Sequence, residues 1–70
     1  MSVKYYNKDD ILVVTLTKTP YEYAEKQGDF IVHFSKQNKP VRIEILNASD
    51  FLKDVSSSIS SSVKKQYISA

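Results

Sequence analysis

Two side chains of this sequence have the chemistry that acid–base catalysis or metal binding requires. His33 is the only histidine, and its ordinary pKa lies near neutrality. Glu44 alternates with isoleucines, so it should point away from the core. Catalysis by either residue would need a defined partner, such as a second carboxylate at a fixed distance, and the sequence indicates none. We interpret His33 as a surface residue of a strand, beside Arg42, and Glu44 as part of a local charge pair or an interface.

Asn7, Asp9 and Asp10 form an acidic cluster that resembles part of a cation site. A calcium loop of the EF-hand type needs twelve residues and a glycine, which this segment lacks. Asn and Asp are also typical of tight turns, because their side chains bond to the nearby backbone. The chain has no cysteine, so thiolate zinc sites and disulfides are excluded. We expect no metal, no cofactor and no enzymatic activity.

Basic residues and tyrosines could together bind single-stranded nucleic acid. However, the net charge is only +2, and only two of the ten basic residues are adjacent. Weak nucleic-acid binding is therefore an alternative function, not the leading one. Its candidate contacts are Lys4, Lys36, Lys39, Arg42, Lys64 and Lys65.

Strand patterns extend over residues 3–46 and predict about five antiparallel strands arranged as a small meander. A first hairpin turning at residues 7–10 would pair Tyr5 with Leu12 and Val3 with Val14. The last hairpin would place alternate residues of 30–34 and 41–46 on the same face. The predicted core face consists of Val3, Leu12, Val14, Phe30, Phe34, Ile43 and Ile45.

After Leu46 the apolar period changes and predicts one amphipathic helix over residues 49–67, packed on that face. Asn47 or Ser49 can cap it. Its apolar stripe consists of Phe51, Leu52, Val55, Ile59, Val63 and Tyr67. Six serines at 56–62 weaken the helix, so a frayed serine-rich end beyond Ser58 is the competing interpretation. The fold class is thus α+β, a single small domain spanning residues 1–70.

Three segments resemble a family of small prokaryotic proteins catalogued as domain of unknown function 2283. They are the strand–acidic turn–strand of 3–14, the glycine followed by an apolar strand at 28–34, and the Ile-Glu-Ile-Leu segment leading to Ala-Ser at 41–49. The similarity covers residues 3–52. The family often has a glycine before the final strand, where this chain has Asn38-Lys39-Pro40. The resemblance implies a small sheet with a helix, no known reaction, and an antitoxin-type role beside small toxin-like ribonucleases.

The opposite sheet face is also partly apolar and predicts an interface. One helix covers only one face of a small sheet, and contiguous exposed apolar residues usually mark a contact surface. The candidate interface consists of Tyr6, Ile11, Val13 and Ile31. We therefore expect a self-associating protein-interaction module, most simply a homodimer, with a small toxin as a further partner. No apolar run is long enough to span a membrane, so we expect a cytoplasmic protein without membrane contact.

Overall fold

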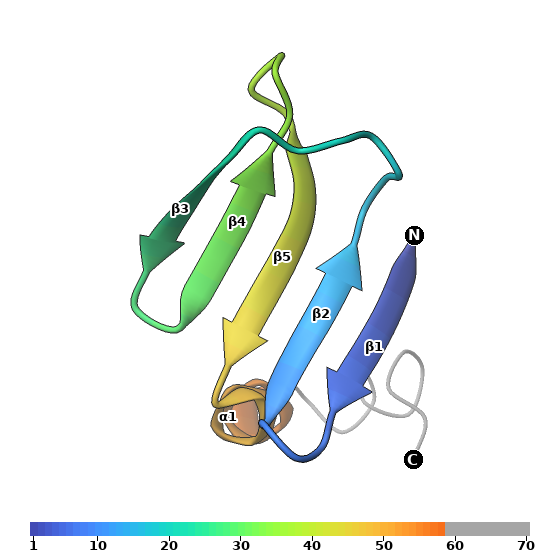
Figure 1. Cartoon of the computed structure of the whole chain (residues 1–70). Coiled ribbons are helices and arrows are strands. Elements are labelled where there is room, and N and C mark those ends of the chain that lie inside the picture. Colours follow the sequence, from blue (N-terminus) through green and yellow to red (C-terminus); the bar gives the residue numbers. More distant parts are fainter. Residues whose placement is uncertain (59–70) are drawn as a thin grey trace.

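The computed structural model describes residues 1–58 of the chain and contains one five-stranded antiparallel sheet followed by one helix (Figure 1). This confirms the predicted α+β fold class. The elements are β1 (Ser2–Tyr6), β2 (Ile11–Thr15), β3 (Tyr23–Gln27), β4 (Phe30–Phe34), β5 (Pro40–Leu46) and α1 (Ala48–Ser58). Among the described residues, no helix is long and apolar enough to cross a membrane.

The last strand, β5, lies in the middle of the sheet, and the strand order is β1-β2-β5-β4-β3. This order departs from the sequential order of a simple meander. After β2 the chain crosses the end of β5, where the amide of Leu16 donates to the carbonyl of Val41 at 2.8 Å, and it continues to the far edge of the sheet. β5 is the longest strand and holds the buried Val41 and Ile45, whereas both edge strands are exposed along their length. The central strand is therefore the one with the most buried residues.

Strand pairing fixes which residues share a face, and it agrees with the predicted pairs. Tyr5 lies opposite Leu12, and Val32 lies opposite Ile43. The face that we call the first face carries Val3, Tyr5, Leu12, Val14, Phe30, Val32, Phe34, Ile43 and Ile45. The pairing of β4 with β5 shifts between His33 and Phe34, so the alternation does not extend to Val41. The second face carries Lys4, Tyr6, Ile11, Val13, Thr15, Ile31, His33, Arg42 and Glu44.

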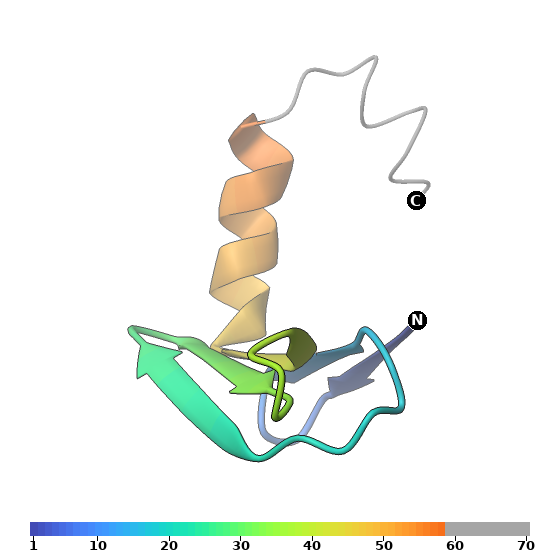
Figure 2. The ribbon, with the colours of Figure 1, turned by 90° about the horizontal axis from the view of Figure 1, so that it is seen from above.

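The helix does not lie along the first face, which corrects the predicted packing. Figure 2 shows α1 rising away from the sheet. It contacts the first face at its base, where the ring of Phe51 meets the ring of Phe30 edge-on with centroids 5.4 Å apart. Leu52, predicted to be covered, is 44% exposed. The predicted stripe residues Ile59, Val63 and Tyr67 lie outside the described residues.

Asp10, in the turn between β1 and β2, sets the direction of the helix. Its carboxylate accepts hydrogen bonds from the Tyr5 hydroxyl at 2.6 Å and from the Ser49 amide and hydroxyl at 3.0 and 2.7 Å. Its carbonyl accepts the Ala48 amide at 2.9 Å. Free amides at a helix N-terminus need acceptors, and here a turn distant in sequence supplies them. Asp10 thus provides the side-chain cap that the sequence assigned to Asn47 or Ser49.

Asn47 and Asp29 hold the other side of the helix base. Asn47 adopts a φ of +50°, a left-handed conformation that turns the chain sharply between β5 and α1. Its side-chain amide donates to the Asp29 carboxylate at 3.3 Å, and the Asp29 carbonyl accepts the Leu46 amide at 2.8 Å. The turns that contain Asp10 and Asp29 both form hydrogen bonds to the base of the helix. The helix therefore cannot tilt down onto the sheet without breaking these bonds.

The buried centre of the first face predicts a graded loss of stability on truncation. Ile45 is 6% exposed, so Ile45→Val should lower the free energy of unfolding by about 1 kcal/mol, measured by chemical denaturation. The control Val3→Ala removes methyl groups from a side chain that is 59% exposed, and it should cost less than about 0.5 kcal/mol. Equal losses at the two positions would contradict the assigned core.

The Asp10 bonds predict a pH-dependent contribution to stability. Hydrogen bonds from Tyr5, and then from Ser49, lower the pKa of Asp10 below its ordinary value of 3.8. The lowered pKa means that this stabilisation is complete above pH 3.8 and is lost as the pH falls through the folded-state pKa. Asn tolerates the φ of +54° at this position, so Asp10→Asn removes the charge without straining the turn.

The variant should melt a few degrees below the original protein at pH 7, and the difference should shrink as the pH falls below 3.8. Asp9→Asn, in the same turn, is the matched control and should leave the melting temperature unchanged. Thermal unfolding followed by circular dichroism measures both. A constant difference between Asp10→Asn and the original protein down to pH 2 would show that the Asp10 charge does not stabilise the helix base.

Candidate functional site

A polar cluster occupies the centre of the second face, where β4 and β5 run side by side. His33 lies opposite Arg42, as predicted, and Glu44 lies two residues further along β5. The imidazole Nε2 of His33 hydrogen-bonds to Glu44 Oε1 across this diagonal, with the side chains 15% and 23% exposed. Glu44 is therefore paired with His33. On neighbouring antiparallel strands, a residue can contact the residue two positions from its direct partner when the side chains are long. This spacing could have revealed the pair in the sequence.

Arg42 lies beside this pair, and its side chain has no ion-pair partner within residues 1–58. Its Nε atom is buried and has no hydrogen-bond acceptor within the described part of the chain. A partly buried cation without a carboxylate is unfavourable, since desolvation is not compensated by an ion pair. The ring of Tyr21 lies over the imidazole of His33 with centroids 4.5 Å apart, and it closes the cluster on one side.

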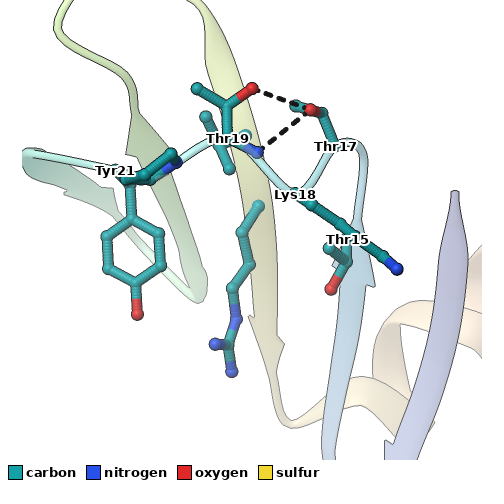
Figure 3. Close-up of a pocket in the computed structure, with 8 residues that line it drawn as sticks. Thr15, Thr17, Lys18, Thr19 and Tyr21 are labelled. Atoms are coloured by element: carbon teal, nitrogen blue, oxygen red, sulfur yellow. Dashed lines mark hydrogen bonds between the residues drawn. The ribbon is translucent and has the colours of Figure 1, made fainter.

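A pocket of about 320 Å³ adjoins Arg42 at the end of the sheet where the chain crosses from β2 to β3. Figure 3 shows Thr15 and Tyr21 on opposite sides of it, with Thr17, Lys18 and Thr19 around its rim. Pro20 and Val41 complete the lining. The hydroxyl oxygens of Thr17 and Thr19 are 2.9 Å apart and share a hydrogen bond. The pocket therefore combines two cations with four hydroxyl groups.

Neither this pocket nor the cluster resembles a metal site. Within residues 1–58, no group of three or more histidine or acidic side chains lies close enough to hold a metal ion. The acidic turn that resembled a cation site instead directs Asp10 to the base of the helix. Among the described residues, the lining of the pocket includes no carboxylate. Its chemistry favours an anion.

The second face brings together all four residues of the predicted interface. Tyr6 pairs with Ile11, and Val13 and Ile31 both flank Glu44. Tyr6 is 40% exposed, with Lys4 Nζ 4.9 Å from its ring centre, whereas Val13 is only 6% exposed. Val13 is therefore part of the core of the single chain. Charged side chains separate the remaining apolar groups, so this face is more polar than the sequence indicated.

The predicted nucleic-acid contacts are spread over two parts of the molecule. Lys4 and Arg42 lie on the second face. Lys36 and Lys39 belong to the connection between β4 and β5, near which Lys39 lines a second hollow with Thr17 and Thr19. Lys64 and Lys65 lie outside the described residues.

Several exposed apolar residues within residues 1–58 lie on the face that the sequence assigned to the core, or on the helix next to it. Because α1 leaves the sheet, the first face and the apolar side of the helix are both accessible. We call this the open apolar surface. It includes the exposed residues Val3, Tyr5, Tyr23, Phe30 and Leu52, each between 39% and 59% exposed. Amphipathicity alone predicts that a helix buries its apolar side, but it does not tell whether the cover comes from the same chain.

Within residues 1–58, a small open antiparallel sheet with one projecting helix defines an α+β protein. Residues 2–49 match the model of the protein family of unknown function DUF2283. This is more than half of the chain, so the protein belongs to that family, and the resemblance noted in the sequence is confirmed. The comparison with curated proteins found no match, and neither did the comparison with solved structures.

The burial of Val13 predicts a contrast between two lysine substitutions on the second face. Val13→Lys places a charge at a buried site and should lower the free energy of unfolding by at least about 2 kcal/mol. Tyr6→Lys, on the exposed part of the same face, should cost less than about 1 kcal/mol. Urea denaturation measures both. If Val13→Lys were tolerated as well as Tyr6→Lys, Val13 would be accessible and the assigned burial would be wrong.

Proposed function

We propose that this protein is a non-enzymatic interaction module that self-associates through the open apolar surface. The observation that carries the proposal is the exposure of Phe30 in β4 and of Leu52 in α1, at 39% and 44%. Domains normally bury their apolar faces between two layers, and here the second layer is missing within residues 1–58. A second copy supplies a suitable layer, because its helix carries the apolar side that this sheet lacks.

A two-fold arrangement would cover both the first face and the apolar side of α1. In such a dimer the α1 helix of one protomer lies along the first face of its partner, and the partner's helix does the same in return. The aromatic side chains of Tyr5, Tyr23 and Phe30 are suited to this role, since aromatic residues contribute most of the energy in many interfaces. Oligomerisation also reinforces domains that are too small to bury a large core.

The polar cluster supports a binding role better than catalysis. His33 and Glu44 are hydrogen-bonded to each other, and the Tyr21 ring contacts the imidazole in a tilted arrangement. A general base must be able to reach a proton on its substrate. In this arrangement the groups with acid–base chemistry are used in holding β4 and β5 together.

Leu52→Lys should disrupt self-association while leaving the sheet intact. Leu52 is exposed in the single chain, so the substitution removes an interface contact without opening the core. We expect the dimer dissociation constant to rise at least about tenfold, measured by sedimentation equilibrium. Lys53→Gln changes the exposed neighbour on the other side of the helix and should leave the constant unchanged.

Because the contact is apolar, the dissociation constant should depend little on salt between low and physiological ionic strength. A monomeric original protein at all concentrations would contradict the proposal, as would an unchanged constant in Leu52→Lys. The antitoxin-type role that the family resemblance implies would use the same surface for a small toxin. Native mass spectrometry of the protein purified gently from its own cells distinguishes a homodimer from a complex with a second protein.

A further inference from the structure

We propose that the pocket beside Arg42 and Tyr21 binds a phosphate group. This site lies on the second face and in the crossover between β2 and β3, away from the open apolar surface. It is therefore independent of the proposed self-association. The ligand class is a phosphate ester, whether a small molecule or the backbone of a single-stranded nucleic acid.

The charge of Arg42 is the first reason. Glu44 is the acidic side chain nearest along the strand, but its hydrogen bond goes to His33. The guanidinium of Arg42 is consequently left without a carboxylate within the described residues, and its buried Nε has no acceptor. An anion on the accessible side of the guanidinium would compensate this charge. Arg suits phosphate well, because its planar fork of donors matches two phosphate oxygens.

The rest of the pocket supplies donors that fit the same ligand. Lys18 lines the rim, and its side chain extends past Thr15 in Figure 3, so a change of rotamer would be needed to bring its charge to the ligand. Together with Arg42 it would then match the charge of a phosphate monoester, about −1.5 to −2 at neutral pH. The hydroxyls of Thr15 and Tyr21, on opposite sides of the pocket, can donate to further oxygens. A carboxylate ligand would use fewer of these donors, so phosphate is the better match.

The backbone of the crossover holds these donors in place before any ligand binds. The amides of Leu16 and Thr17 both donate to the Val41 carbonyl, at 2.8 and 3.4 Å, and the Thr19 amide donates to the Thr17 hydroxyl at 3.2 Å. Pro20 restricts the chain further by fixing its φ. A preorganised site loses less conformational entropy on binding.

The size of the pocket and the position of Tyr21 suggest what is attached to the phosphate. A volume of about 320 Å³ exceeds what a bare phosphate fills and is at the lower end of ligand sites. Tyr21 is 50% exposed, and its ring contacts the His33 ring at a tilt of 51°. Its outer surface can stack on a planar group, such as a nucleobase.

Titration with inorganic phosphate, followed by the amide resonances in nuclear magnetic resonance, tests the site directly. We expect the shifts to concentrate at residues 15–21 and at Val41 and Arg42. Lys18→Gln, in the exposed crossover, should weaken binding about tenfold, because one charge-assisted bond is lost. Arg42→Gln should weaken it at least as much. Its circular dichroism spectrum establishes that the sheet remains folded, and Lys18→Gln carries the test if it does not.

Lys26→Gln is the matched control, because Lys26 pairs with Ile31 on the same face but does not line the pocket. It should change the phosphate affinity less than about twofold. Shifts spread evenly over surface lysines, or an equal loss in Lys26→Gln, would overturn the proposal in favour of non-specific ion attraction. An absence of shifts at the pocket would overturn it outright.

Two further probes distinguish the sources of the phosphate group. A nucleoside monophosphate that binds more tightly than inorganic phosphate, with shifts at Tyr21, identifies a small ester. A single-stranded oligothymidylate that binds more tightly still, with an affinity that falls steeply as salt rises, identifies a nucleic-acid backbone. Either result supports the site, provided that Lys18→Gln weakens it and Lys26→Gln does not.

Discussion

The carboxylate of Asp10 is the constraint on which the shape of this protein depends. It joins the first hairpin to the start of α1, through bonds to the amide and hydroxyl of Ser49, while Tyr5 holds it from β1. On the other side, Asn47 reaches Asp29 in the turn before β4. The helix base is fixed by hydrogen bonds at two points that are far apart in the sequence, in addition to the contact between Phe51 and Phe30. Without these bonds an amphipathic helix next to an apolar sheet face would be expected to lie down on it.

This geometry explains why the protein has so much accessible apolar surface for its size. Small chains bury a limited fraction of their surface, and this one leaves aromatic residues such as Tyr5 and Phe30 partly exposed on the same side as Leu52. Scattered apolar residues on a surface need no explanation, but a sheet face and a helix side that meet at an angle form a surface with a defined shape. The helix has an apolar side and the sheet has an apolar face, and this pairing is the basis on which we propose a second copy as the missing layer.

The two sides of the sheet differ in character because of which residues alternate along β5. On the first face β5 contributes Ile43 and Ile45, and on the second it contributes Arg42 and Glu44. Glu44 forms its hydrogen bond with His33, so it is not available to pair with Arg42. This pairing determines the chemistry of the second face. One hydrogen bond between adjacent strands thus both stabilises the sheet and leaves a positive charge at the edge of a pocket.

The sequence alone was sufficient for the number of strands, for the pairs Tyr5–Leu12 and Val3–Val14, and for the family, because alternation and turn chemistry are local properties. The third strand, predicted at Tyr21–Glu25, lies at Tyr23–Gln27. It also placed Tyr6 and Val13 on one face correctly, although it could not tell that Val13 is buried within the single chain. Three features were decided only by the tertiary structure: the central position of β5, the cap that Asp10 provides to α1, and the diagonal bond from Glu44 to His33. Each of them depends on contacts between residues that are distant along the chain and that come together only when the sheet has formed. The periodicity of the sequence does not predict such contacts.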